Sequence, residues 1–576
     1  MKLTGIEYKP RRRNCLAPGV FTVGIGLLTL TLLSLFVAEK KVIIRHSPIN
    51  RNIQWLQLFG EDQMIYTMRR SGYDPLFYFN PSTASSYLKY KILDGYVGII
   101  EPYVPNELYV YGADATAYYE YQLCNVNNDA DCSEGVTYLE TGKSTVNVQV
   151  GCTAYDVYNL VVIKRSTASS EVVETSQGQV MCMNVRREMR ELSYQDQQLT
   201  MDTMKVLWEV DDATGEAQFG DAYKSANYLL EFHFYNAAWQ TGDHIHEGLG
   251  FIPQHLKLTN IFENSLRAVN PAVSLPYWDY TIETAANVSV WDSPVFQADT
   301  FGSLTAPPDE YWGWTYASAS VDAGQIPNGR WAGATTGINE KFPDLRSAYG
   351  NMRAPWSMNP SKYITRFASA DKILPTCGSH YQLLEYKTFA EFLHWSPYAP
   401  HGSTHGSIGG IFGCDALDSM LKAGYLKDAE GQRNLCKNWI FYLKELYRAG
   451  TWTPRKDCAM NGKDASLSTC GFQCNTKLKG EMKKMLYMIL NSDYEVTPMP
   501  LKFDDMEAWT DFVCDGDGYK VFAGDHLESA SAADPSFWPI HPTLDRLLQA
   551  KFMSGGWETP STWPDDVFDK VRPVGN

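Results

Sequence analysis

The sequence predicts a multidomain protein with an N-terminal membrane anchor, a β-rich, sandwich-like domain, and a mainly α-helical domain. The helical domain is expected to have a helix-bundle core and a cysteine-rich helical insertion. Residues 16–38 contain no charge, residues 144–150 (STVNVQV) alternate polar and apolar side chains, and apolar residues recur at helical steps after His255. These patterns are typical of a membrane span, a half-buried strand and an amphipathic helix, in that order.

Length and composition limit the classes of protein to which the chain can belong. A chain of 576 residues is too long for one hydrophobic core, so at least two domains are expected. Apolar residues make up 44% and charged residues 20%, which is typical of globular proteins. The formal net charge of −16 argues against a nucleic-acid partner.

The N-terminal apolar run is 23 residues long, enough to cross a bilayer. It is preceded by a basic flank that contains Lys9 and Arg11. This flank predicts a cytoplasmic tail at residues 1–15, a signal anchor at 16–38, and a C-terminal ectodomain outside the cell or in a secretory lumen. A cleaved signal peptide, cut after Ala38, is the alternative.

Twelve cysteines fit a translocated protein. Cys15 borders the predicted span and is either a lipidation site or a plain thiol. The other eleven predict disulfides in the ectodomain, and because eleven is odd, at least one is free or bonded outside the chain. A zinc site formed by Cys458, Cys470 and Cys474 is the weaker interpretation.

Residues 46–182 form the predicted β-rich domain. Short aromatic or β-branched runs such as AYYEYQL and YNLVVIKR lie between turn residues, as in sandwiches and small barrels. The region shows no metal-binding or nucleophile pattern. A spacer or shield is therefore favoured over a ligand-binding module, for example one for a cell-wall glycan.

The helical domain is predicted at residues 183–576. Near residue 183 the spacing of apolar residues changes from that of a strand to that of a helix, and Ser193 precedes a helical pattern. Within it, Leu258, Phe262 and Leu266 share one helical stripe with His255, and Asn270-Pro271 ends the helix. An imidazole on a buried stripe needs a hydrogen-bond partner or a metal ion.

His255 is one of six histidines that fall into two groups of three. The predicted metal ligands are His233, His246 and His255 in the first group, and His401, His405 and His541 in the second. Imidazole suits copper, and three neutral nitrogen ligands leave a copper ion open to further ligands. His401 and His405 are four residues apart, so one helix face can present both.

The segments around these histidines resemble the copper regions of tyrosinases. FIPQH followed by a helix and LPYWDYT is similar to the first copper region, and HxxxH, GG and DPxFxxxHxxxDR to the second. The resemblance covers residues 183–412 and 520–550 and indicates the coupled binuclear, type-3 copper family of tyrosinases, catechol oxidases and, more distantly, hemocyanins. It implies two copper ions, dioxygen as co-substrate, and Asp545 as a carboxylate near the second copper.

The chain departs from the family pattern at several neighbours of the ligands. Ile540 replaces a histidine beside the last ligand, and His244 stands where some relatives have a cysteine bonded to a ligand. Gly402 occupies a position that is often Asn, which predicts that o-diphenols are oxidised much better than monophenols. His394 and His244 are the candidate catalytic groups for proton transfer. The other histidines, including His526, are expected to be structural or on the surface.

Residues 413–500 are predicted to be an insertion, because 136 positions separate His405 from His541 and the relatives have these motifs closer together. The insertion contains two helical patterns and five cysteines. A disulfide-stapled helical subdomain is therefore expected. Three roles stay open for the insertion: a lid over the site, a binding site for a partner, or a surface addition without a role in catalysis.

The predicted function is that of a membrane-anchored, copper-dependent phenol oxidase that converts o-diphenols to o-quinones, with monophenols left open. Its expected partners are small phenols or exposed tyrosines of wall or matrix proteins. The alternatives are a reversible oxygen carrier and a cell-surface protein whose copper fold has lost catalysis. The motif Asn287-Val288-Ser289 further predicts a glycoprotein.

Overall fold

The computed structural model describes residues 95–558 with short gaps, and three short strands before them. The gaps are 111–112, 138–144, 305–310, 313–314, 317–323, 338–340, 343, 346, 369–373, 456–469, 492–500 and 528. The predicted tail, the anchor at 16–38 and Cys15 lie outside the described residues. Among the helices that are described, none has the length and apolar character needed to cross a membrane.

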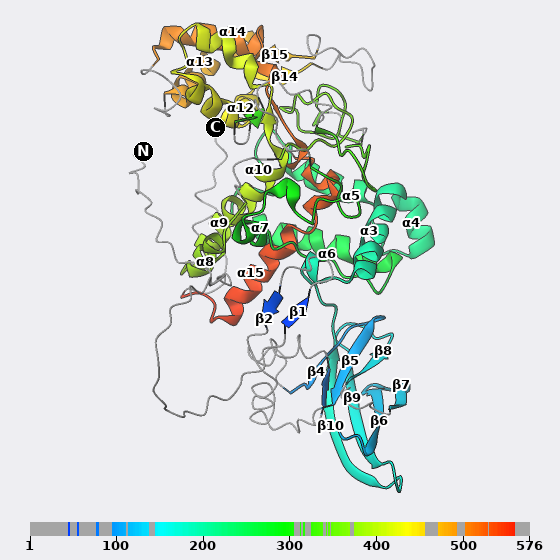
Figure 1. Cartoon of the computed structure of the whole chain (residues 1–576). Coiled ribbons are helices and arrows are strands. Elements are labelled where there is room, and N and C mark those ends of the chain that lie inside the picture. Colours follow the sequence, from blue (N-terminus) through cyan, green and yellow to red (C-terminus); the bar gives the residue numbers. More distant parts are fainter. Residues whose placement is uncertain are drawn as a thin grey trace, which may run out of the picture. The chain divides into compact units, whose positions relative to one another are not determined.

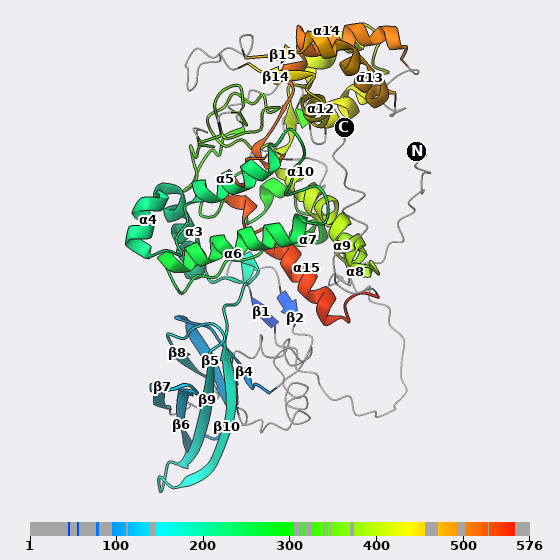
Figure 2. The ribbon, with the colours of Figure 1, turned by 180° about the vertical axis from the view of Figure 1, so that it is seen from behind.

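The chain forms two compact units. One contains strands β1 (Ile44–His46) to β10 (Val172–Cys182), up to Tyr194, together with Asn270–Ser274, and the other contains the helices from Gln195 onward and the short strands among them. The two units carry separate colours in Figures 1 and 2, blue to cyan for the first and green to red for the second. Each unit is described by itself.

The β unit contains a five-stranded and a three-stranded sheet. The first has the order β4-β10-β9-β6-β7, with β4 (Gly98–Ile100), β10 (Val172–Cys182), β9 (Val157–Ser166), β6 (Ala117–Asn125) and β7 (Asn128–Thr137). The second has the order β3-β5-β8, with β3 (Phe77–Phe79), β5 (Pro105–Val110) and β8 (Thr145–Gln149). Only β4 and β10 run parallel within these two sheets. β1 (Ile44–His46) and β2 (Gln54–Leu56) form a separate antiparallel pair.

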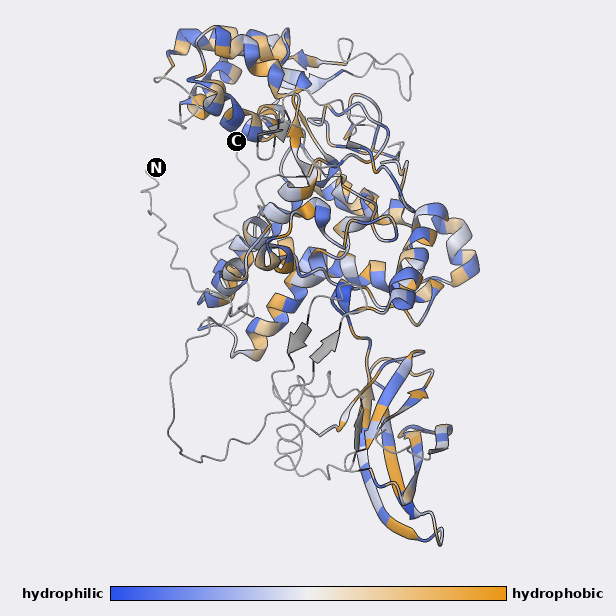
Figure 3. Cartoon of the chain, in the orientation of Figure 1, coloured by the Kyte–Doolittle hydropathy of each residue, from blue (hydrophilic) through white to orange (hydrophobic). Residues whose placement is uncertain are grey.

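The two larger sheets share one hydrophobic core. Leu108 of β5 and Val148 of β8 belong to the same buried cluster as Leu123 of β6 and Leu160 of β9. Figure 3 shows the alternation of apolar and polar residues along these strands. The disulfides Cys124–Cys132 and Cys152–Cys182 stabilise the unit further. The predicted β-rich region is thus confirmed.

The helical unit contains helices from Tyr194 to Met553. Its helices outside the insertion are α3 (Tyr194–Glu209), α4 (Asp212–Phe219), α5 (Ala226–Ala237), α6 (Phe251–Val269), α7 (Thr281–Ala286), α8 (Cys377–Glu385), α9 (Phe389–Trp395), η4 (Pro397–Gly402), α10 (Ser403–Gly409) and α15 (His541–Met553). The described residues between α7 and α8 are mostly irregular and complete this unit. Short 3₁₀ turns η10 (Asp525–Leu527), η11 (Ser531–Ala533) and η12 (Pro535–Phe537) lead into α15.

Helix α6 follows the predicted pattern closely. It ends at Val269, directly before Asn270-Pro271, and it buries His255, Leu258, Phe262 and Leu266 on one face. The ring of Phe262 stacks on that of Trp538 with centroids 3.9 Å apart. This contact fixes α6 against the turn that begins α15.

Two paired strands mark where the chain enters and leaves the insertion. β13 (Ile411–Phe412) lies antiparallel to β16 (Phe522–Ala523), with Ile411 opposite Ala523 and Phe412 opposite Phe522. The remaining strands of this sheet are β11 (Tyr311–Trp312) and β12 (Thr315–Tyr316). Because the insertion begins and ends at neighbouring strands, the two motifs that flank it stay close in space.

The insertion is a helical subdomain stapled by disulfides, as predicted. It contains α11 (Asp418–Lys422), α12 (Ala429–Arg448), α13 (Lys479–Leu490) and α14 (Met506–Cys514), with the hairpin β14 (Trp452–Pro454) and β15 (Phe472–Cys474). These elements lie together in both views (Figures 1 and 2). Disulfides join Cys414 to Cys436 and Cys474 to Cys514. The subdomain therefore continues past residue 500, the end that the sequence suggested.

The bonding of the described cysteines agrees with the disulfides that the sequence predicts. Cys470 is disulfide-bonded and Cys474 is joined to Cys514, so neither thiolate is available to a zinc ion. The third member of that alternative, Cys458, lies outside the described residues. Cys377 carries a free thiol, as the odd number of cysteines requires.

Candidate metal centre

The six predicted histidines form two triads. His233, His246 and His255 make the first, and His401, His405 and His541 make the second. Within each triad one ligand nitrogen of every histidine lies within 4.8 Å of the others. The ring of His255 stacks on that of His541, with centroids 4.6 Å apart and planes 12° from parallel, so the triads adjoin.

The first triad comes from three separate segments. His233 lies on α5 and donates from Nδ1 to the carbonyl of Ser529 at 2.7 Å, and His255 on α6 donates from Nδ1 to the carbonyl of Phe251 at 2.9 Å. His246 lies in the loop between these helices, and its Nδ1 contacts the carboxylate of Asp243 at 3.0 and 3.2 Å.

In the second triad every Nδ1 atom lies against a backbone carbonyl. Nδ1 of His401 donates to the carbonyl of Pro397 at 3.2 Å, and Nδ1 of His541 to that of Phe537 at 3.0 Å. Nδ1 of His405 donates to the carbonyl of His526 at 2.9 Å. All three histidines are buried.

These bonds leave Nε2 of each ring as the free lone pair. A carbonyl only accepts, so a ring that donates from Nδ1 is the tautomer whose Nε2 can bind a metal. Nε2 of His255 and Nε2 of His405 are buried without a hydrogen-bond partner. The Nε2 atoms of His401 and His541 face each other at 3.0 Å. Converging lone pairs without donors are the arrangement that a metal ion satisfies.

Burial keeps five of these imidazoles neutral, which metal ligation requires. Burial, reinforced by the neighbouring His246, lowers the pKa of His233 to about 3. Burial likewise holds the pKa values of His255, His401, His405 and His541 well below the ordinary value. The aromatic rings of Phe251 and Phe537 pack against the histidines and contribute to this dry environment.

The motif LPYWDYT positions the last ligand rather than binding metal itself. The backbone N–H of Trp278 donates to the carbonyl of Pro539 at 2.9 Å, and Thr543 Oγ1 donates to the carbonyl of Trp278 at 2.6 Å. Arg546 on α15 forms an ion pair with Asp279 at 2.9 Å. These three contacts fix the first turn of α15, where His541 lies.

The two histidines of HxxxH do not share one regular α-helix. His401 lies on the π-helical turn η4 and His405 on α10, which follows it. The expectation of one helix face is corrected in this respect, because a proline at position 400 removes a backbone donor inside the first turn. The glycine pair after α10 also has a steric reason: a Cβ at Gly410, whose φ is +63°, would lie 2.5 Å from the carbonyl oxygen of Phe367.

Buried charges beside the second triad were not evident from the sequence. The His526 ring lies against that of His405 and contacts Ser536 Oγ at 2.8 Å, and Asp534 accepts from Ser536 at 2.7 Å. Arg366 forms a buried ion pair with Asp534 at 2.6 Å. His526 is therefore buried beside the metal centre, in contact with His405. Only the aspartate of the DPxF motif indicated this cluster in the sequence.

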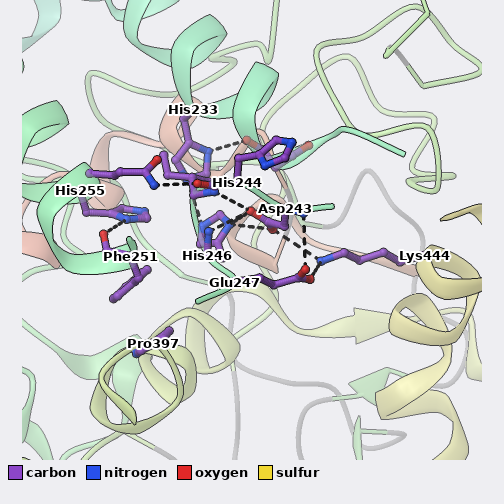
Figure 4. A network of polar contacts seen from close by, with 12 residues as sticks. His233, Asp243, His244, His246, Glu247, Phe251, His255, Pro397 and Lys444 are labelled. Carbon is purple, nitrogen blue, oxygen red and sulfur yellow. Dashed lines mark hydrogen bonds and ion pairs between the residues drawn. The ribbon is translucent and has the colours of Figure 1, made fainter. Parts of the chain in front are cut away.

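Asp243 was also missed by sequence reasoning, although its position three residues before His246 is a usable signal. It is buried, accepts the backbone N–H groups of Ile245 and His246 at 3.1 and 2.9 Å, and lies 3.5 Å from Nζ of Lys444 (Figure 4). Burial alone would raise the pKa of Asp243. The charge and hydrogen bond of His246, together with Lys444, hold that pKa well below its usual range.

The remaining predicted residues lie around the centre. His244 is exposed, and Figure 4 shows its ring directed away from His255. His394 on α9 is exposed, with its ring near those of Trp395 and Tyr398. In the described part of the chain, no hydrogen bond or ring contact joins either side chain to a ligand histidine. Asp545 accepts from Gln549 at 3.0 Å, while His541 Nδ1 is held by a carbonyl. Their roles stay predictions.

Two adjoining triads of imidazoles could hold two metal ions, and this donor set suits copper. Residues 223–422 match the family model described as the common central domain of tyrosinase. This stretch therefore carries a tyrosinase central domain, of the type-3 copper family. Its two triads fit the binuclear copper site typical of that family.

Two curated relatives match short stretches of the chain. Grixazone synthase of Streptomyces griseus subsp. griseus is 38% identical over 63 residues, 11% of this chain and 19% of that protein. Tyrosinase of Streptomyces glaucescens is 37% identical over 59 residues, 10% of this chain and 21% of that protein. The chain thus spans about a fifth of the length of these relatives.

Proposed function

We propose that this protein is a copper-dependent phenol oxidase that uses dioxygen to convert o-diphenols to o-quinones. The observation that supports this proposal is the pair of adjoining triads, in which Nε2 atoms converge and the rings of His255 and His541 stack. Each triad would hold one copper ion. The copper pair would bind and reduce dioxygen, while two catechols each give up two electrons and two protons and two waters form.

The chain's own groups prepare this chemistry. Carbonyls hold the Nδ1 protons of five ligands and Asp243 holds that of His246, so every Nε2 faces the metal position. Phe251 and Phe537 exclude water from the imidazoles. His394 and His244 are the proposed proton acceptors. Because their rings are exposed, each would act through a water.

We further propose that the catalytic part of the chain lies outside the cell or in a secretory lumen. The support is the set of disulfides in both units, which form in oxidising compartments. A protease-protection assay on sealed vesicles, with a tag at residue 576, tests this proposal and the predicted anchor together. A tag on the cytosolic side would refute it.

The central experiment combines metal analysis with oxygen uptake. The purified protein is expected to hold two copper ions per chain and to consume one dioxygen for every two molecules of catechol. A reversible oxygen carrier would bind dioxygen without oxidising catechol. A protein with one copper per chain, or with zinc and full activity, would contradict the assignment.

A further inference from the structure

The loop that carries His246 rests on the inserted subdomain. Gln240 Nε2 donates to the carbonyl of Tyr447 on α12 at 2.9 Å. Glu247, at the other end of the loop, forms ion pairs with Arg448 at 2.7 Å and with Lys444 at 3.2 Å. Helix α12 therefore contacts the loop on both sides of Asp243 and His246.

Lys444 is the residue of α12 nearest to a ligand. Its Nζ lies 3.5 Å from Asp243 Oδ2 and 3.2 Å from Glu247 Oε1, and only 17% of its side chain is exposed. The same Nζ lies 5.6 Å from the centroid of the Trp356 ring. Two carboxylates and an aromatic ring thus fix this ammonium group in one place.

The contact matters because Asp243 is a buried anion. A buried carboxylate is unfavourable unless a cation and hydrogen bonds compensate it. Its hydrogen bonds come from the loop, and within the described residues Lys444 is the lysine or arginine in ion-pair contact with it. Figure 4 shows the resulting series of contacts from Lys444 through Asp243 to His246. Residues that orient a ligand imidazole typically change metal affinity by about 10–100-fold when altered.

We propose that Lys444, from the inserted subdomain, is a positioning residue for the first copper: it keeps Asp243 against Nδ1 of His246 and so sets the copper affinity of the first triad. This inference rests on the proposed function only in taking copper as the metal of the triads. It assigns the insertion a task in the metal centre, where the sequence left a lid, a partner site or decoration open. In the second triad, by contrast, the Nδ1 atom of each histidine lies against a backbone carbonyl.

The test is a titration of the full-length apoprotein with Cu(I) against a competing chelator, which reads affinity and stoichiometry independently of activity. In Lys444→Gln one of the two coppers should bind about 3–10-fold more weakly, while the other is unchanged; the loss is smaller than for a direct partner of the ring because Lys444 acts through Asp243. Lys444→Arg, which keeps the charge, should return that affinity to within about threefold of wild type. The matched control is Lys422→Gln on α11, which removes an exposed ion pair with Asp418 and should change neither copper.

A double-mutant cycle separates the proposed route from general loss of structure. If Lys444 acts through Asp243, Lys444→Gln should add no more than about a twofold effect in the Asp243→Asn background. Unchanged affinity in Lys444→Gln, equal weakening of both coppers, or full additivity with Asp243→Asn would each overturn the proposal. A wild-type protein that binds two coppers without oxidising catechol would refute the oxidase proposal and leave this one standing.

Discussion

The two histidine triads are positioned by different means. The three histidines of the second triad donate to carbonyls of Pro397, His526 and Phe537, which belong to the backbone of the core. The first triad depends in part on a side chain, because His246 is oriented by Asp243. A backbone acceptor persists through most substitutions, whereas a carboxylate acceptor can be lost by a single one. The first triad is therefore the adjustable half of the centre.

The largest expected effect is the loss of a ligand from either triad. His255→Ala and His541→Ala should each abolish oxidase activity and reduce the copper content from two ions to one per chain, because each removes one of three ligands. Metal analysis and oxygen uptake with catechol check this. Retention of two coppers in either variant would contradict the assignment of that ligand.

The next prediction tests the difference in how the two triads are oriented, by a carboxylate in the first and by backbone carbonyls in the second. Asp243→Asn should weaken the first copper by about 10–100-fold, because an amide holds the His246 ring less firmly than a carboxylate does. His526→Gln should change the second copper by less than that, because His405 Nδ1 lies closer to the backbone carbonyl of residue 526, at 2.9 Å, than to Nδ1 of its ring, at 3.2 Å. Competition titrations with Cu(I) measure both. Comparable losses in the two variants would remove the distinction drawn between the triads.

A third prediction concerns the pH dependence of the apoprotein. The folded-state pKa of His233 is about 3, below the ordinary value of 6.5, so the unfolded chain binds more protons between these pH values. The free energy of unfolding should therefore fall as the pH is lowered from about 6.5 towards 3. Urea denaturation at several pH values measures this. His233→Gln should show a shallower dependence, and an identical slope would contradict the buried, neutral state of this histidine.

The smallest effect concerns substrate choice at Gly402. The ratio of initial rates on a monophenol and its catechol is expected to be low and to rise in Gly402→Asn, which adds an amide able to hold a water. However, a Cβ at this position would lie 3.0 Å from the carbonyl oxygen of Pro397, the acceptor of His401. Gly402→Ala is therefore the necessary control. A high wild-type ratio that is lost in His394→Ala would instead assign the proton transfer to His394.

The six histidines of the triads were predicted because the short motifs around them resemble the copper regions of tyrosinases, and α6 was predicted because its pattern is local. Spacing placed His255 on a buried stripe, and proline marked the end of the helix. The groups that orient these histidines could not be predicted in the same way. Lys444 approaches Asp243 only through the fold of the insertion, and Ser529 contributes a carbonyl, which every residue carries. The π-helical turn at His401 was missed because the HxxxH spacing by itself favours a regular α-helix.

The paired strands β13 and β16 give the inserted subdomain the character of a detachable module. Ile411 lies opposite Ala523 and Phe412 opposite Phe522, so a hairpin turn of two to five residues would join the strands once the segment between them was removed. The shortened protein would keep all six ligands and lose the cation that faces Asp243. Such an arrangement lets a surface addition modify one copper of a pair while the helices that carry the ligands stay as they are.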